Sequence, residues 1–143
     1  MIIKQLSIFV ENKSGRLADI TNILAENNVD IRALSIADTT DYGILRIIVN
    51  DPIAAEKALK ASGVTFSVTE VIAAAVPDEP GGLNSAVFCL SKENVSIEYM
   101  YAFLNPKQGT AFLIMRVDNN ERAIEILKNN GIAMMTDDEV KNL

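Results

Sequence analysis

The stretch Glu11-Asn-Lys-Ser-Gly-Arg-Leu17 returns 66 residues later as Pro77-Asp-Glu-Pro-Gly-Gly-Leu83. Gly15 of the first stretch aligns with Gly81 of the second, and the leucine that ends each stretch is the same. Because an internal repeat fixes the architecture of a chain, this match outweighs any single motif. The sequence therefore predicts one structural unit written twice.

The match continues along both copies, with a change of spacing near their ends. Gly43 aligns with Gly109 at the same offset of 66, whereas Leu59 aligns with Leu127 at an offset of 68. The second copy has therefore gained two residues. We expect this insertion in or beside the third strand of the second copy.

Hydrophobic periodicity assigns the same order of elements to each copy. Alternation from Leu6 to Val10 is typical of a strand, and Asp51-Pro52 is a helix start, with a capping residue followed by proline. In the first copy we expect strands over 5–10, 31–37, 44–49 and from 64 onward, and helices over 15–27 and 52–62.

The second copy is expected to follow the first. Its predicted elements are a helix over 83–90, strands over 95–104, 110–117 and 132–135, and a helix before the last of these strands. Asp118 is predicted to cap this last helix, with Glu121 completing a capping box. The charged tail over 137–143 is expected to be loosely held.

The junction between the copies has an unusual composition. From Val64 to Val76 there is no glycine, proline, asparagine or aspartate, so one long strand shared by both units is the economical interpretation. We place the units at 1–69 and 70–143. Two helices on one face of a four-stranded antiparallel sheet, twice over, predict an α+β fold of two ferredoxin-like βαββαβ units.

Composition narrows the possible functions. The net charge of −6 disfavours nucleic acid and anionic membrane surfaces as partners. The chain has no histidine and a single cysteine, Cys89, so the commonest general base and the usual zinc ligand sets are missing. We expect no metal, no cofactor and no catalytic residue, and a protein of the reducing cytoplasm.

Chemistry is most plausible at the loop between the first strand and the first helix of each copy. The first N–H groups of a helix lack intrahelical partners and carry partial positive charge, which suits a carboxylate. Asn12 and Asp78 occupy matching loop positions and can accept hydrogen bonds from an ammonium group. Together these features describe an amino-acid site, although a glycine at such a junction also has a purely structural use in the turn.

These loops, each between an alternating strand and an amphipathic helix, resemble the signature of the ACT domain. The resemblance continues through Val29-Asp30-Ile31 and Val95-Ser96-Ile97 and covers nearly the whole chain. ACT domains are regulatory modules that commonly pair sheet beside sheet and bind amino acids at the interface between units. The resemblance therefore implies ligand contacts from two loops: Asn12, Lys13, Ser14, Gly15, Arg16 and Leu17 in the first copy, and Asp78, Glu79, Pro80, Gly81, Gly82 and Leu83 in the second. It also implies contacts from Asp30 and Ser96, which open the second strands, each to a ligand held by the loop of a neighbouring unit.

Three hypotheses remain open at this point. The first is a non-catalytic regulatory protein that binds an amino acid and assembles as a homodimer or a higher homo-oligomer. The second is a small metabolic enzyme, because ferredoxin-like scaffolds host many chemistries. The third is a dimerisation module without a ligand.

Overall fold

The computed structural model describes residues 1–38, 41–104 and 107–143. The described chain divides into two compact units. We call Lys4–Thr69 the N-terminal unit, and Glu70–Leu143 together with Met1–Ile3 the C-terminal unit. The long strand β4 (Phe66–Pro77) runs through the division between Thr69 and Glu70.

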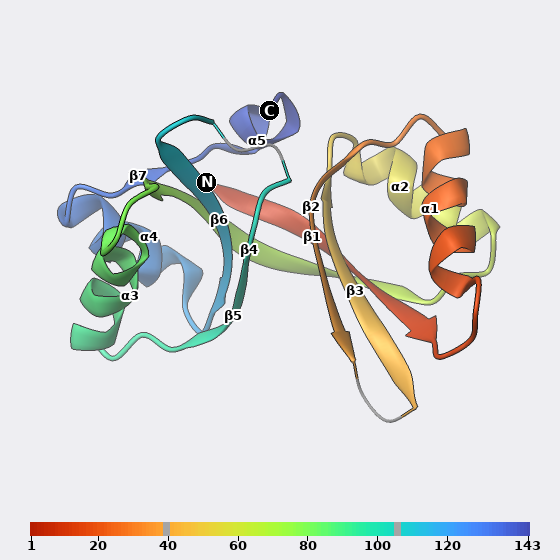
Figure 1. Cartoon of the computed structure of the whole chain (residues 1–143), viewed down its shortest axis with the longest axis horizontal. Coiled ribbons are helices and arrows are strands. Elements are labelled where there is room, and N and C mark those ends of the chain that lie inside the picture. The colour runs from red at the N-terminus through yellow and green to blue at the C-terminus, as the bar shows by residue number, and fades with distance from the viewer. Residues whose placement is uncertain (39–40, 105–106) are drawn as a thin grey trace. The chain divides into compact units, whose positions relative to one another are not determined.

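In the N-terminal unit the strands follow the order β2-β3-β1-β4. Its elements are β1 (Ile2–Glu11), α1 (Arg16–Glu26), β2 (Ile31–Asp38), β3 (Tyr42–Val49), α2 (Pro52–Ala61) and the first part of β4. The strand pairs β1–β3 and β2–β3 are antiparallel. Both helices cover one face of this sheet (Figure 1). This is a ferredoxin-like arrangement, with an amphipathic helix after the first and third strands.

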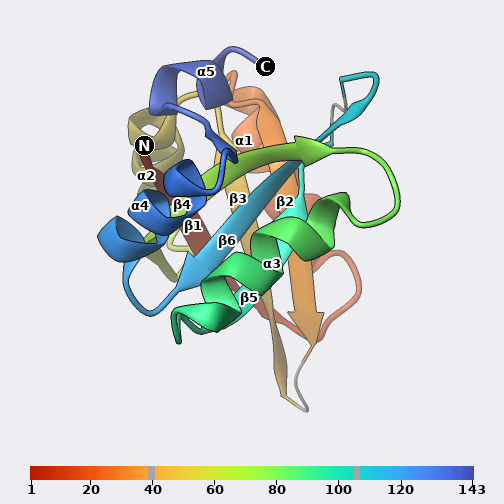
Figure 2. The same ribbon diagram turned by 90° about the vertical axis from the view of Figure 1, so that its left-hand side faces the viewer.

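The C-terminal unit repeats this order as β7-β4-β6-β5. Besides β4 it contains α3 (Gly82–Lys92), β5 (Ile97–Ala102), β6 (Thr110–Val117), α4 (Asn120–Asn129), β7 (Ala133–Met134) and α5 (Asp137–Lys141). Helices α3 and α4 lie on one face of the sheet (Figure 2). The predicted fold class, two ferredoxin-like units with helices on one face of an antiparallel sheet, is confirmed.

Each unit has an apolar core between its helices and its sheet. In the N-terminal unit, Leu6 and Ile8 of β1 and Ile20 and Leu24 of α1 are fully or almost fully buried. They lie on one face because strand residues repeat every second position and helix residues every third or fourth. The same pattern buries Ala86 and Leu90 of α3 in the C-terminal unit.

The strand registers confirm that the insertion lies beside the third strand of the second copy, but they change one residue match. Val10 pairs with Gly43 in the first copy, and Val76, its counterpart, pairs with Ala111 in the second. The offset is therefore already 68 when the third strand begins, which places the two extra residues between β5 and β6. The predicted match of Gly43 with Gly109 is wrong, and Ala111 is the structural counterpart of Gly43.

The predicted cap of the last helix is also wrong by one residue. Asn119 caps α4 and its side chain accepts a hydrogen bond from the N–H of Arg122. The carboxylate of Asp118 instead accepts from the N–H of Ser96, just as Asn50 accepts from the N–H of Asp30 in the first copy. Because the carboxylate of Asp118 already accepts a hydrogen bond next to the start of β5, the side chain of Asn119 caps the helix instead.

The C-terminal tail is ordered, contrary to the expectation that it would be loosely held. Thr136 and Glu139 form a reciprocal capping box at the start of α5, and Val140 is completely buried. Hydrogen bonds from Thr136 hold the pKa of Glu139 below its ordinary value. The capping box and the buried side chain of Val140 therefore hold in place a segment that was expected to be loosely held because it is charged.

Candidate functional site

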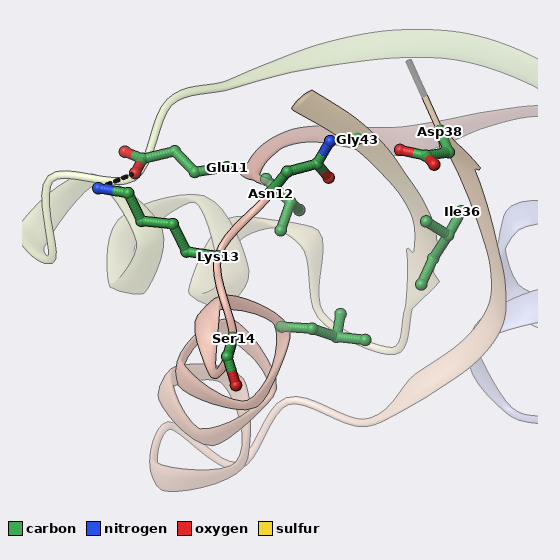
Figure 3. A pocket seen from close by; sticks show the side chains of 9 residues that line it. Glu11, Asn12, Lys13, Ser14, Ile36, Asp38 and Gly43 are labelled. Carbon is green, nitrogen blue, oxygen red and sulfur yellow. Dashed lines mark ion pairs between the residues drawn. The ribbon is translucent and has the colours of Figure 1, made fainter. Parts of the chain in front are cut away.

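A cleft of about 520 Å³ lies beside the loop that joins β1 to α1 in the N-terminal unit. Figure 3 shows the side chains that surround it. The cleft is lined by Val10, Glu11, Asn12, Lys13, Ser14, Leu17, Ile36, Asp38 and Gly43. Its volume is within the range usual for small-molecule sites. Four of the loop residues singled out from the sequence therefore share one cavity: Asn12, Lys13, Ser14 and Leu17.

The backbone at Gly15 determines how the loop enters the helix. Gly15 is the N-cap of α1 with φ of 88°, a left-handed conformation that residues with a side chain rarely adopt. No side chain caps this end of the helix. The first N–H groups of α1 consequently have no side-chain acceptor at the cap, and they carry the positive end of the helix dipole.

The cleft has an apolar wall and a polar rim. Val10 pairs with Gly43, and Ile36 pairs with Leu45 of the core, so these residues face the helix side of the sheet. The amide of Asn12 and the carboxylate of Asp38 point toward one another across the cleft (Figure 3). An apolar wall with a few convergent polar groups is typical of small-molecule sites.

The charges around the loop are arranged unevenly. Lys13 Nζ lies 3.2 Å from Glu11 Oε2, and Arg16 Nη1 lies 3.7 Å from Asp19 Oδ2. Asp38 forms no ion pair with any side chain in the described ranges. The cationic side chains of Lys13 and Arg16 are therefore each already paired with an acid. The carboxylate of Asp38 has no such partner among the described side chains.

The corresponding loop of the C-terminal unit has the same turn and a tighter backbone. Gly81, the N-cap of α3, has φ of 90° and again no side-chain cap. A Cβ at Gly82 would lie 2.0 Å from the carbonyl oxygen of Pro77, a distance that no side chain tolerates. The N–H of Asp78 donates to the carbonyl of Gly109, and the N–H of Gly82 donates to that of Glu79. Pro80 and the partly exposed Leu83 complete this loop.

Asp30 and Ser96, at the start of the second strands, were expected to contact the ligand from a neighbouring unit. Asp30 Oδ2 forms an ion pair with Arg32 Nη1 at 3.1 Å and does not line the cleft beside Asn12. Ser96 lines a different cleft of about 490 Å³, between the end of α3 and the start of β5. Within each unit the structure therefore does not bring the loop and the start of the second strand together.

Sequence reasoning missed several residues of the cleft, above all Asp38, Gly43, Ile36 and Glu11. Asp38 lies just beyond the strand expected over 31–37 and Ile36 lies within it, and neither was assigned to the site. A signal was nevertheless present in the repeat, because Leu104 occupies the position that matches Asp38 at the offset of 66. Asp38 in the first copy and Leu104 at the equivalent position of the second copy show that the local chemistry differs between the copies.

Other reactive groups give no second centre in the described part of the chain. Cys89 is buried, its thiol donates to the carbonyl of Ala86, and desolvation raises its pKa. No cluster of three metal-ligating side chains occurs among the described residues. None of the helices described is long and apolar enough to cross a membrane.

The structure defines a tandem module of two ferredoxin-like units, and comparison with known proteins gives its family. The family model for an ACT domain pair matches residues 1–143, so the chain belongs to the ACT domain pair family. The matching family is regulatory, and no catalytic family is indicated. Such membership supports a role in regulation by small molecules.

Two solved structures illustrate what the chain is similar to. Protein BT0572 from Bacteroides thetaiotaomicron is 43% identical, with a TM-score of 0.94, and the match covers 100% of this chain and 98% of that one. The ligand-free regulatory subunit of aspartate kinase from Thermus thermophilus is 11% identical, with a TM-score of 0.64 over 91% of this chain and 95% of that one. The latter likeness shows the fold alone. No curated protein matches the chain.

Proposed function

We propose that the chain is a non-catalytic regulatory protein that binds an amino acid in the cleft beside the β1–α1 loop. The observation that supports this most is the coincidence of Asn12, Ser14 and Leu17 in one cavity of suitable size. These loop residues are also the ones for which the resemblance to ACT domains implies ligand contacts. Regulation by small molecules is the broader statement that the family supports.

The cleft offers complementary groups for the two charges of an amino acid. The uncapped start of α1 supplies N–H donors and positive potential for a carboxylate. Asn12 can accept a hydrogen bond from an ammonium group or donate one to the carboxylate. The apolar wall formed by Val10, Leu17 and Ile36 provides contact for a side chain.

Regulation would follow from differential affinity. A ligand shifts an equilibrium only toward the arrangement that binds it better, and it stabilises that arrangement by mass action. We propose a homodimer or a higher homo-oligomer as this arrangement. In support, β2 is the outermost strand of its unit and exposes Leu34 and Ile36, and exposed apolar edges favour pairing with another chain.

The absence of catalysis is proposed on chemical grounds. The chain has no histidine, and the buried thiol of Cys89 has a raised pKa that disfavours the reactive thiolate. The same buried, unpaired thiol fits the proposed location in the reducing cytoplasm.

A thermal-shift screen of the twenty common amino acids tests the proposal. A ligand at one hundred times its Kd adds about 2.7 kcal/mol of stability, which raises the melting temperature by roughly 5–10 °C in a chain of this size. We expect at least one amino acid to do so. Sedimentation velocity of the same samples, with and without that amino acid, tests the assembly.

Substitutions in the loops locate the site. Asn12→Ala is expected to remove most of the shift. Asn22→Ala makes the same chemical change on the exposed surface of α1, where Asn22 donates to Glu26, and should retain it. Asp78→Ala tests the second loop in the same way. If no amino acid raises the melting temperature, the proposal is wrong. If Asn12→Ala keeps the full shift, the proposed cleft is wrong, and loss of the shift in Asp78→Ala alone would move the site to the second loop.

A further inference from the structure

The carboxylate of Asp38 is held at the rim of the cleft by the strand pairing. Asp38 is the last residue of β2, and its Cα pairs with that of Gly43 in β3. The pairing positions the backbone of Asp38 next to a residue without a side chain. Figure 3 shows the carboxylate pointing across the cleft toward Asn12.

The electrostatics of the cleft favour a cation beside Asp38. Lys13 is paired with Glu11 at 3.2 Å, and these two side chains lie on the opposite side of Asn12 from Asp38 (Figure 3). Asp38 itself has no cationic partner among the side chains that the structure describes. A bound cation next to Asp38 would gain an ion pair without breaking an existing one.

The C-terminal unit lacks this carboxylate. Leu104, at the matching position, is apolar and 55% exposed, and Ala111 replaces Gly43. An acid at this position is therefore no requirement of the ferredoxin-like fold, since the second copy folds with leucine there. Among the described residues, Asp38 also has no ion-pair partner that would explain a structural role.

We infer that Asp38 binds the ammonium group of the ligand and selects zwitterionic amino acids over deaminated analogues. This inference rests on the proposed function and adds to it the residue that recognises the positive charge. The ligand's carboxylate lies toward the start of α1, and its ammonium group lies between Asp38 and Asn12. The first copy therefore binds a ligand that carries an ammonium group, whereas the second copy, with Leu104, does not.

The test compares two ligands that differ only in having an ammonium group or a hydroxyl group at the same carbon. The amino acid identified in the screen is titrated by calorimetry alongside the 2-hydroxy acid of the same carbon skeleton. The wild-type chain should prefer the amino acid by about tenfold or more, and Asp38→Asn should bring this preference close to one. Affinity for the hydroxy acid should be unchanged in Asp38→Asn, because its hydroxyl makes no ion pair.

Control variants separate a local effect from a general one. Asp41→Asn removes the same charge from the same hairpin at an exposed residue outside the cleft, and it should keep the wild-type preference. If Asn12→Ala abolishes binding while Asp38→Asn keeps the full preference, the role of Asp38 is overturned and the proposed function stands. If neither ligand binds the wild-type chain, both are overturned.

Discussion

The two β–α loops of this protein have nearly the same backbone and different chemistry. Their N-cap glycines, Gly15 and Gly81, have φ of 88° and 90° and ψ of −11° and −12°. One copy has Asn12 and Asp38 beside a cleft, and the other copy has Asp78 and Leu104 at the matching positions. The shared turn belongs to the fold, so it cannot by itself distinguish a binding loop from a structural one.

The two copies also differ in residues of the neighbouring strand that lie next to the turn. Gly43 leaves the floor of the first cleft open, whereas Ala111 adds a methyl group at the same place in the second copy. The two copies therefore differ in the neighbouring strand as well as in the loop sequence.

The largest effect is expected from Gly82→Ala, which tests the tightness of the second loop. Its Cβ would lie 2.0 Å from the oxygen and 3.0 Å from the carbonyl carbon of Pro77, both of them backbone atoms. The loop would have to move, at a cost of about 3 kcal/mol in the free energy of unfolding. Urea denaturation, followed by circular dichroism, measures this loss.

Arg16→Ala is the matched control, because Arg16 occupies the equivalent position of the first loop. Its side chain forms only a partly exposed ion pair with Asp19, which contributes little to stability. The change should alter the free energy of unfolding by less than about 0.5 kcal/mol. Equal losses for the two variants would mean that the loops do not differ in tightness.

The next effect is on binding and comes from Gly43→Ala, which gives the first copy the residue of the second. The added Cβ meets nothing closer than 3.5 Å, so the fold should tolerate it. The methyl group would nevertheless occupy the cleft near Ile36. We expect the affinity for the amino acid found in the screen to fall by about tenfold, or about 1.4 kcal/mol, at an unchanged melting temperature without ligand.

Ala111→Gly is the reverse exchange and should leave that affinity unchanged. Calorimetric titration of both variants gives the comparison directly. Binding that is weakened equally by the two exchanges would place the ligand in both copies, and binding that neither exchange weakens would place it away from Gly43.

The fold could be predicted from the sequence because it depends on patterns that recur locally. Alternation through Leu6 and Ile8, the cap at Asp51 and the repeat around Gly15 each constrain the backbone within a few residues. The ordered tail was missed because its stability depends on burial of Val140, a tertiary contact that a charged segment does not reveal.

The candidate site was predicted only as far as the loop extends. Asn12, Ser14 and Leu17 are contiguous with the motif, whereas Asp38 and Gly43 reach the cleft through strand pairing. Pairing register depends on the exact length of the β5–β6 connection, and the sequence match of Gly43 with Gly109 concealed the shift by two residues. Asp38, just beyond the strand expected over 31–37, was consequently not assigned to the site.

The smallest effects are expected at the caps of α2 and α4, where the two copies should behave alike. Asp51 accepts from the N–H of Ala54 at 3.0 Å and Asn119 from that of Arg122 at 3.1 Å. Alanine at either position should cost about 1 kcal/mol in urea denaturation. Asp118→Ala removes one longer hydrogen bond, of 3.3 Å to the N–H of Ser96, and should cost less than Asn119→Ala. A larger loss for Asp118→Ala would restore Asp118 as the cap and break the equivalence of the copies at this position.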